Sequence, residues 1–588
     1  MRNVYNIIIF LLWFSNVSAQ VIPVERRVDW SVAGYPGNIP HPELIINAVD
    51  FGANGDSLTD NATALNDAIS FLAGNRGVIS FPPGTFLFRS GINLTDSVII
   101  RGASSDETHF VFDLGGAAEN CFNIDHGQSV DFTTLVAGFE KGSGYIVVTD
   151  PSLFEANAWA ELRQSNGSWD TEPISWADHS VGQIIYIKAI STDTLMIQNP
   201  LRFNYDPGLN PEVRPIETAH ETGLECFKIT RADNALQGVG YNFYFAFATN
   251  CWIRGVESSK SIGSHIYLTQ CSGVEITGSY IHDAFAYNGS GTRGYGITLN
   301  KHSGECLVEN NILKHLRHAL MIKTGANGNV FAYNYSIEPY RSEPIHDFSG
   351  DISLHGHFAF ANLFEGNIVQ NIIIDHYWGP SGPWNTMFRN RPELYGIFMT
   401  SSDTTETGMQ NFVGNEITNP IGFYLLTGED HFEYGNNFKG TILPEGTGDL
   451  PDTSYYRSDI PAFWDITDPW PPIGPPNDTG EYSIPARERY LKGWTKTVCS
   501  DTLYTVKNTW EYEHSIELFP NPSTGIVYLK SRKKIAKVLI YNIQGRLLRE
   551  FDQTPSKIVL DDHLTDGLYL IRFLSDKHVH TQKLLLKR

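Results

Sequence analysis

The sequence of 588 residues contains little charge, and basic residues are the scarcer part of it. Charged residues make up 18%, with 43 Lys and Arg against 65 Asp and Glu, so the formal net charge is −22. A nucleic-acid-binding protein gains most of its affinity by neutralising phosphates with Lys and Arg. The composition therefore argues against a nucleic acid partner.

Cysteine is also scarce. Six residues in a chain of this length are too few for a disulfide scaffold, and no Cys-x-x-Cys pair indicates a structural zinc site. Cys226, Cys251 and Cys271 follow one another at intervals of 25 and 20 residues, a spacing that suggests stacking in successive turns of a repeat. We interpret them as buried small apolar residues and not as bridged cysteines.

Long apolar runs are absent except at the start of the chain. Residues 7–14 are apolar, follow Arg2, and precede the small residues Ser18 and Ala19, which is the pattern of a cleaved signal peptide. The run is shorter than the roughly 20 apolar residues that a membrane-spanning helix needs. We predict a signal peptide over residues 1–19 and no transmembrane segment in the mature protein, which then acts outside the cytoplasm.

Glycine, proline and aromatic residues are plentiful. The 52 Gly and 30 Pro separate many short apolar segments, and aromatics reach 12%, which predicts an all-β protein. The length predicts at least two structural units. The distribution of charge also indicates two units. Residues 515–588 hold 13 Lys and Arg against 7 Asp and Glu, whereas the part between signal peptide and tail carries a net charge of −29.

The basic tail has the pattern of a small β-sandwich. Pro520-Asn521-Pro522 opens it, a Gly-x-Tyr-x-Ile-x-Phe strand follows over residues 567–573, and a basic strand over 583–587 closes it. These motifs resemble the C-terminal sorting domain of the type IX secretion system of Bacteroidetes. The resemblance implies transport through the periplasm and outer membrane by that machinery, removal of the tail, and a secreted or cell-surface product. A carbohydrate-binding sandwich is the alternative for this segment.

A second set of motifs lies near the N-terminus. Phe51-Gly52-Ala53-Asn54-Gly55-Asp56 is followed by Thr59-Asp60, then by Leu65, Ala68, Ile69 and Leu72 at helical spacing, then by Phe81-Pro82-Pro83-Gly84-Thr85-Phe86. This stretch resembles the opening of the rhamnogalacturonase/epimerase-like pectate lyase superfamily. The resemblance implies a right-handed parallel β-helix whose first turn is capped by the short helix. It identifies a scaffold that several activities share.

Internal repetition supports a solenoid. Short motifs with Gly or Asn recur at Gly278, Asn311, Asn334, Asn367, Asn415 and Asn436, at intervals of 33, 23, 33, 48 and 21 residues. Intervals of 21 and 23 fit single turns, 48 fits two turns, and each interval of 33 leaves about ten residues for an inserted loop. We interpret the recurring Asn residues as an internal ladder of stacked amides.

Two segments depart from the repeat. Residues 131–225 contain alternating strands and predict a small β insertion. Residues after 439 are rich in Pro, Gly and Asp. The expected organisation is therefore a signal peptide over 1–19, a β-helix over 20–439, a covering segment and linker over 440–514, and the sorting domain over 515–588.

Histidine is concentrated in one part of the repeat. Nine of the 19 His residues fall between His265 and His376, in the window that also contains both 33-residue intervals. Within it, the alternation over residues 351–357 predicts one polar face, with Ile352 and Leu354 on the buried face. The preceding and following turns carry further cationic and aromatic residues. The candidate catalytic residues are His355, His357, Lys323, Arg389 and His318, and the candidate substrate-binding residues are Arg317, Arg391, Trp378, Trp384, Tyr377 and Asp351.

These residue types fit an acidic polysaccharide. β-Elimination from a uronate needs a cation at the carboxylate, a base for the C5 proton and an acid for the leaving oxygen. An Arg or Lys supplies the cation, His355, His357 or Lys323 the base, and Tyr377 the acid, while Trp faces stack on sugars. We therefore expect a secreted polysaccharide lyase.

Two other functions are alternatives to the lyase. A glycoside hydrolase would use a pair of carboxylates, for which Asp347, Asp351, Asp375 and Glu365 are available. A non-catalytic glycan-binding or adhesive β-helix would use none. We expect no cofactor. Calcium stays open as an alternative that no motif supports, because the calcium-binding motif of the best-known pectate lyases is not found. His355 and His357 with Asp351 are weak evidence for a transition metal.

Overall fold

The computed structural model describes residues 20–499, apart from 73, 129, 236–237, 401–405 and 494–495, and residues 516–587, apart from 520–522, 532–536, 543–545, 552–556, 561–562 and 575–578. The predicted signal peptide, residues 500–514 of the expected covering segment and linker, and the Pro520-Asn521-Pro522 motif lie outside the described residues. The chain divides into two compact units, Met1–Cys499 and Ser500–Arg588, and each is described by itself.

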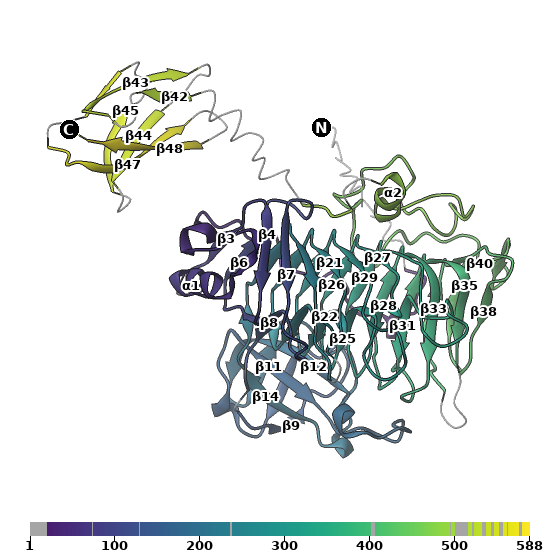
Figure 1. The fold of residues 1–588 in the computed structure, drawn as a ribbon. Helices are drawn as coiled ribbons and strands as arrows, with labels where there is room; N and C mark the ends of the chain where they lie inside the picture. The colour runs from purple at the N-terminus through teal and green to yellow at the C-terminus, as the bar shows by residue number, and fades with distance from the viewer. Residues whose placement is uncertain are drawn as a thin grey trace, which may run out of the picture. The chain divides into compact units, whose positions relative to one another are not determined.

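The first unit is a parallel β-helix, in which each coil of chain contributes short strands to three parallel ladders (Figure 1). Ladder one contains β1 (Ile45–Asn47), β3 (Gly77–Ser80), β6 (Val98–Arg101), β16 (Gly223–Glu225), β20 (Trp252–Arg254), β23 (Glu275–Thr277), β26 (Leu307–Glu309), β29 (Val330–Ala332), β32 (Leu363–Glu365), β34 (Thr386–Phe388), β36 (Asn411–Val413) and β39 (Phe432–Tyr434). Ladder two contains β2 (Asp56–Asp60), β4 (Gly84–Phe88), β7 (Thr108–Phe112), β17 (Lys228–Arg231), β21 (Glu257–Ser259), β24 (Tyr280–His282), β27 (Ile312–Lys314), β30 (Tyr335–Ile337) and the start of β33 (Ile368–Asp375). Ladder three contains β5 (Ile92–Asn93), β8 (Phe122–Asp125), β18 (Phe243–Ala246), β22 (Ser264–Thr269), β25 (Tyr295–Asn300), β28 (His318–Ile322), β31 (Ile352–His355), the end of β33, β35 (Arg391–Met399) and β38 (Phe423–Leu425).

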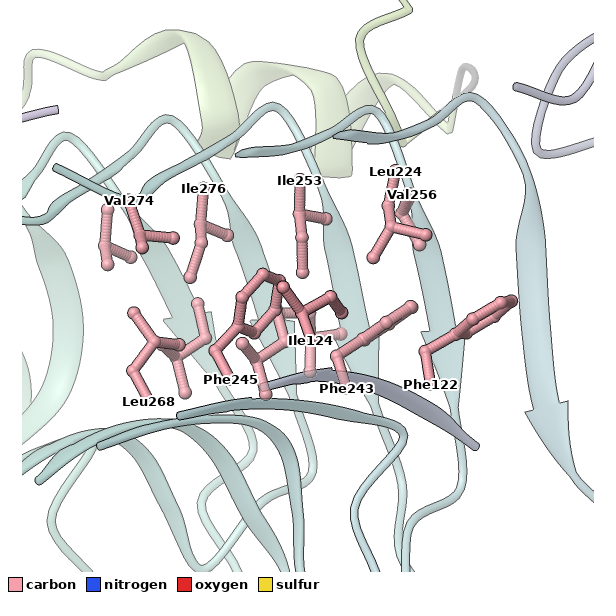
Figure 2. Packing of buried hydrophobic residues seen from close by; sticks show 14 of the residues in the cluster. Phe122, Ile124, Leu224, Phe243, Phe245, Ile253, Val256, Leu268, Val274 and Ile276 are labelled. Carbon is pink, nitrogen blue, oxygen red and sulfur yellow. The ribbon is translucent and has the colours of Figure 1, made fainter. Parts of the chain in front are cut away.

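Apolar side chains from the ladders meet inside the solenoid. Figure 2 shows Ile253 and Ile276 of ladder one facing Phe243 and Phe245 of ladder three across the interior. Equivalent residues of successive coils stack on one another, as the rings of Phe122 and Phe243 do with centroids 5.8 Å apart and planes at 6°. A core of this kind is continuous along the axis, because each coil buries its inner face only against its neighbours.

Helix α1 (Ala62–Leu72) covers the N-terminal end of the solenoid (Figure 1). The four apolar residues that predicted the helix, namely Leu65, Ala68, Ile69 and Leu72, are all buried in the solenoid core. The expected capping role of this helix follows from that packing.

An Asn ladder runs along the turns that follow ladder one. The side-chain oxygen of each member accepts hydrogen bonds from the backbone N–H and the amide of the previous member, at 2.9–3.2 Å, through Asn311, Asn334, Asn367, Asn390, Asn415 and Asn436. The prediction that the recurring Asn residues form a ladder is thus confirmed, with two corrections. Asn390 divides the 48-residue interval, and the position that precedes Asn311 belongs to Ser279 and not to Gly278, since the Ser279 N–H donates to the Asn311 side chain.

The insertion is a closed six-stranded barrel in the order β10-β13-β12-β11-β14-β9, with its own apolar core. It lies along the turns that follow ladder three, where Arg202 forms an ion pair with Glu305 at 2.6 Å and Glu161 accepts a hydrogen bond from His302 at 2.9 Å. Its strands are β9 (Thr133–Ala137), β10 (Tyr145–Val148), β11 (Ala158–Arg163), β12 (Gly182–Ser191), β13 (Thr194–Ile197) and β14 (Glu212–Ile216). The remaining strands of this unit are β15 (Ala219–His220), β19 (Ala248–Thr249), β37 (Glu416–Ile417), β40 (Asn436–Phe438) and β41 (Thr441–Leu443), and its 3-10 helices span Val24–Arg26, Ala48–Phe51, Pro151–Leu153, Ser175–Ala177 and Pro207–Leu209.

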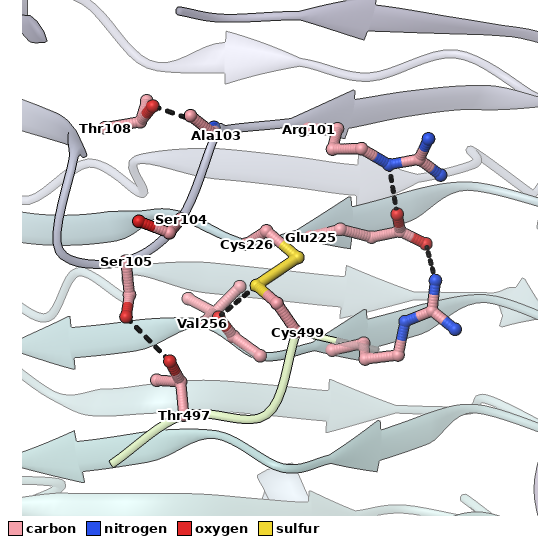
Figure 3. The surroundings of a disulfide bond; sticks show 12 residues. Arg101, Ala103, Ser104, Ser105, Thr108, Glu225, Cys226, Val256, Thr497 and Cys499 are labelled. Atoms are coloured by element: carbon pink, nitrogen blue, oxygen red, sulfur yellow. Dashed lines mark hydrogen bonds and ion pairs between the residues drawn. A yellow bond between two sulfur atoms is a disulfide. The ribbon is translucent and has the colours of Figure 1, made fainter. Parts of the chain in front are cut away.

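Residues 444–499 form a covering segment that includes helix α2 (Pro485–Lys492) and packs on the outside of the solenoid. Figure 3 shows its last residue, Cys499, joined to Cys226 by a disulfide. The interpretation of Cys226 as an unbridged residue is therefore wrong. Cys251 and Cys271 are free and buried, but they do not share a row, since Cys251 lies opposite Val274 and Cys271 opposite Ala248.

The second unit is a sandwich of a three-stranded and a four-stranded antiparallel sheet around a small apolar core. Its strands are β42 (Ile516–Phe519), β43 (Ile526–Ser531), β44 (Lys537–Asn542), β45 (Leu547–Phe551), β46 (Lys557–Val559), β47 (Gly567–Leu574) and β48 (Val579–Leu586). The expected all-β architecture, a right-handed parallel β-helix with a β insertion and a C-terminal β-sandwich, is confirmed. No helix in the part of the chain that the structure describes has the length and apolar character to cross a membrane.

Candidate active site

A cavity of about 630 Å³ opens on ladder three, where β25, β28, β31 and β33 lie side by side. Two long loops form its wall, residues 283–294 before β25 and residues 338–351 before β31. They correspond to the insertions expected from the two 33-residue intervals. The cavity is lined by Trp176, Gly289, Gly291, Thr292, Tyr295, Arg317, His318, Lys323, Arg341, Glu343, Phe348, Ser349, Gly350, His355, Ile373, Asp375, Tyr377, Trp378, Phe398 and Thr400.

The strand register places three polar residues in one row across the floor of this cavity. Ile322 pairs with Leu354, so Lys323 lies opposite His355 on the next coil, and His355 pairs directly with Asp375. Neighbouring strands are about 4.8 Å apart. The chain thereby gathers residues that are 20 to 50 positions apart in sequence, as the repeat led us to expect.

His355 and Asp375 are joined by a hydrogen bond of 2.7 Å between Nδ1 and Oδ2, and both side chains are about one-sixth exposed. The other oxygen of Asp375 accepts the backbone N–H of Tyr377 at 3.1 Å. The ring of Tyr377 is parallel to that of His355, with centroids 6.4 Å apart, and is 73% exposed. Since a carboxylate on Nδ1 favours the proton on that nitrogen, Nε2 of His355 is left as the acceptor.

His318 lies beneath the same cavity. Burial, together with the charges of Arg317 and His355, holds its pKa well below the ordinary value, so the ring is neutral at pH 7. Its Nδ1 is 3.3 Å from the carbonyl oxygen of Gly350, and its ring lies edge-on to Tyr295 at 4.8 Å and 5.7 Å from the ring of His355. His318 therefore fits a role in positioning the neighbouring rings.

Lys323 is the partly buried cation of the row. Burial lowers its pKa to about 8, and Nζ lies 5.0 Å from the ring centroid of Trp176. Within the described residues, no carboxylate lies within 4.0 Å of this ammonium group. An ammonium without a carboxylate partner, at the edge of a cavity, is suited to pair with an anionic ligand.

Arg317 contributes a second cation. Its guanidinium donates to the carbonyl oxygens of Asn288 and Gly291 in the first long loop and lies 5.7 Å from the ring centroid of Tyr295. Arg341 and Glu343 of the second long loop also line the cavity. Neither residue is among the site residues predicted from the sequence. Their position in an inserted loop of the His-rich window could have indicated them.

Asp351 and His357 lie behind the cavity wall. The Asp351 carboxylate is buried and accepts the backbone N–H groups of Asn371 and Gln370, and burial raises its pKa to about 7. His357 is fully buried beside Trp378, with Nε2 3.2 Å from the carbonyl oxygen of Glu172. The predicted polar face over residues 351–357 thus needs correction, because β31 ends at His355 and the chain turns at Gly356, where φ is +72°.

Arg389, Arg391 and Trp384 lie elsewhere, which corrects their assignment to the groove. Arg389 donates to backbone carbonyls of the covering segment, including that of Ile473 at 2.6 Å, and Arg391 pairs with buried Glu416 at 2.8 Å. Both guanidinium groups are 1% exposed. Trp384 is buried under Lys141, whose Nζ is 4.0 Å from the ring centroid. These residues hold the covering segment and the barrel against the solenoid.

The described residues include no group of three or more His, Cys, Asp or Glu side chains placed to bind a metal ion. The cavity offers three cations, Arg317, Lys323 and Arg341. It also contains a His–Asp pair, an exposed tyrosine and the two tryptophans Trp176 and Trp378.

The stacked coils, the Asn ladder and the capping helix define a parallel β-helix. Residues 45–126, which contain β1 to β8 and α1, match the family model described as rhamnogalacturonase A/epimerase, pectate lyase-like. Residues 517–587 match the secretion system C-terminal sorting domain. Both resemblances noted in the sequence are confirmed, and the sorting domain indicates export through the type IX system to a secreted or cell-surface location.

The chain is also similar to solved structures at low identity. The tailspike protein gp49 from Pseudomonas phage LKA1 is 14% identical over 63% of this chain and 64% of that protein, with a TM-score of 0.42, so this chain spans under two thirds of that tailspike. An exopolygalacturonase from Thermotoga maritima is 11% identical over 69% of this chain and 95% of its own, with a TM-score of 0.37. PfbA, a surface adhesin of Streptococcus pneumoniae, is 11% identical over 67% and 84%, with a TM-score of 0.35. No curated protein matches the chain in sequence.

Proposed function

We propose that the protein is an exported polysaccharide lyase that cleaves a uronate-containing glycan by β-elimination in the ladder-three cavity. The observation that carries the proposal is the row of Lys323, His355 and Asp375. In it, a partly buried ammonium group without a carboxylate partner lies next to a histidine whose tautomer is set by a carboxylate. The family match of residues 45–126 supports an activity on polysaccharides.

Each step of the elimination has a candidate group. Arg317 and Lys323 neutralise the uronate carboxylate, which stabilises the negative charge that develops as the C5 proton leaves. Nε2 of His355 takes that proton. The electron pair of the C5–H bond forms the C4–C5 double bond, the bond from C4 to the glycosidic oxygen breaks, and Tyr377 donates a proton to the leaving oxygen. Trp378 and Trp176 stack on sugar rings at the cavity edge.

The carboxylates of the cavity favour elimination over hydrolysis. A glycosidase needs one carboxylic acid that is protonated at working pH, hence with a raised pKa. Among the lining residues the carboxylates are Asp375, which is bonded to His355, and Glu343, whose pKa is lowered by the backbone N–H of Gly289. Asp351 and Glu365 have pKa values raised to about 7, but neither lines the cavity.

The test is incubation of the purified protein with a panel of uronic-acid and neutral polysaccharides. A lyase produces unsaturated uronates, which absorb in the ultraviolet, and the signal should disappear in H355A. The matched control is H220A, which removes an exposed histidine outside the lining residues and both long loops. Reducing ends without ultraviolet absorbance would establish the hydrolase, and binding without either product would establish the adhesive alternative.

A further inference from the structure

A second cavity, of about 860 Å³, lies on the same ladder nearer the N-terminal end, over β8, β18, β22 and β25. Its composition differs from that of the first. Glu119 is the one charged residue among the residues that line it, and no Lys or Arg contributes. Eight of its lining residues are amides or phenols, namely Asn93, Asn120, Asn123, Gln270, Asn300, Tyr241, Tyr244 and Tyr267.

The three tyrosines form a parallel stack. Tyr244 and Tyr267 occupy equivalent positions on β18 and β22, and Asn123 continues the same row on β8. The ring of Tyr241 is 4.5 Å from that of Tyr267 and 5.8 Å from that of Tyr244, and the planes are within 15° of one another. No described side chain or backbone group is hydrogen-bonded to the three hydroxyls, which leaves them free for a ligand.

An unpartnered atom points to the same use. Asn300 Oδ1 is buried and has no hydrogen-bond partner among the described residues. A buried amide oxygen without a partner is costly, and a donor bound beside Asn300 would satisfy it. A sugar hydroxyl is such a donor.

The second cavity is continuous in register with the first. Leu299 pairs with Ile322, so Asn300 lies opposite Lys323 on the next coil. Tyr244 is three strands away from the strand that ends beside Lys323, which corresponds to about 14 Å at roughly 4.8 Å per strand. A glycan chain that follows the solenoid axis would therefore extend from one cavity into the other.

We propose that the second cavity binds neutral sugar residues of a polysaccharide. Rings of neutral sugars present hydroxyls to amides and apolar C–H faces to aromatic rings, and they need no cation. A uronate is disfavoured there, because the only charge is the carboxylate of Glu119 and the body of the protein is strongly acidic. The binding claim stands without the proposed lyase activity, since it depends on none of the residues of the first cavity.

The experiment is affinity electrophoresis and titration calorimetry of the full chain with soluble neutral polysaccharides, including xylan, glucomannan and mixed-linkage glucan, and with polygalacturonate and alginate. Retardation by at least one neutral glycan is expected, with affinity reduced about threefold to tenfold in Y244A. Y267F keeps the stack and removes one hydroxyl, so it tests the site if Y244A fails to fold. The control Y145A removes an exposed tyrosine of the barrel, outside both cavities, and should bind as the parent does.

The outcomes separate this proposal from the lyase proposal. H355A should retain neutral-glycan binding even though it loses elimination. Absence of retardation by every neutral glycan, or retardation that Y244A and Y267F leave unchanged, overturns the proposal. The proposal is also overturned if only acidic glycans retard the protein and this retardation depends on Tyr244, because the cavity then binds acidic and not neutral sugars.

Discussion

The Nδ1 of His355 lies 2.7 Å from Oδ2 of Asp375, on the next coil of the same ladder. The pair is produced by the repeat itself, since 20 residues of chain make one circuit between them. Asp375 holds the imidazole with one oxygen and the backbone of Tyr377 with the other. A single carboxylate thereby fixes both the candidate base and the candidate acid.

Replacing Asp375 with Asn should lower kcat by about 100-fold or more while leaving KM nearly unchanged, because the amide no longer favours the proton on Nδ1 of His355. Steady-state kinetics on the polysaccharide identified in the panel would measure this. The control is D178N, which removes an exposed carboxylate of the insertion outside the cavity lining. Equal losses in both variants would remove Asp375 from the reaction.

Activity should fall as the pH rises above about 8. Lys323 has a pKa lowered to about 8 by burial, so it is mostly protonated at pH 7 and loses its charge through that pH. The reaction needs the charged form to neutralise the uronate. In K323R, where the cation persists to high pH, the alkaline limb of the pH–rate profile should move upward. An unchanged alkaline limb would assign it to another group.

Arg317 and Arg391 should behave differently when each is replaced by Ala. R317A should raise KM for an acidic polysaccharide about tenfold and leave the melting temperature close to that of the parent, because Arg317 is partly exposed at the cavity. R391A should lower stability by about 3–5 kcal/mol, because it leaves buried Glu416 without its partner. Thermal unfolding and kinetics on both variants would show the contrast, and a KM effect of R391A in a folded protein would contradict it.

Residue spacing in the sequence predicted part of the ladder and part of the cavity. The Asn residues at single-turn intervals predicted the ladder, and the 33-residue intervals predicted where the cavity walls are. The 48-residue interval concealed Asn390, which stands between Arg389 and Arg391. Had Asn390 been placed in the ladder, its two neighbours would have been placed on that ladder's turn, away from the cavity.

Other features have no local signal in the sequence. Side chains alternate between two faces only within a strand. Because β31 ends at His355 and the chain turns at Gly356, His357 does not lie in the row that contains His355. Cys226 and Cys499 are 273 residues apart, and only the path of the covering segment brings them together. Contacts made by a segment that lies across a repeat are set by tertiary packing and not by periodicity.

Three largely buried carboxyl groups should each contribute stability that decreases as the pH rises toward 7. Burial raises the pKa of Asp351, Glu275 and Glu365 to about 7 in the folded protein, above their ordinary values near 4. The folded state therefore binds these protons more tightly than the unfolded state, and the stabilisation is complete below about pH 4 and is lost as the pH passes 7. Each group contributes up to about 1.4 kcal/mol per pH unit in that window. The contribution of Asp351 is the difference in unfolding free energy between the parent and D351N, measured by denaturant unfolding between pH 5 and 8. That contribution should shrink as the pH rises, and a contribution that grows with pH would contradict the assignment.

The disulfide between Cys226 and Cys499 should hold the covering segment on the solenoid. It closes a loop across 273 residues, and a bridge over so long a loop is expected to contribute about 2–5 kcal/mol. C499S should lower the unfolding free energy by this amount and expose residues 444–499 to limited proteolysis, while activity at low temperature is retained because neither cysteine lines the cavity. Reductant should have the same effect on the parent protein and none on C499S. Equal proteolysis of parent and variant without reductant would show that the packing of the segment alone is sufficient.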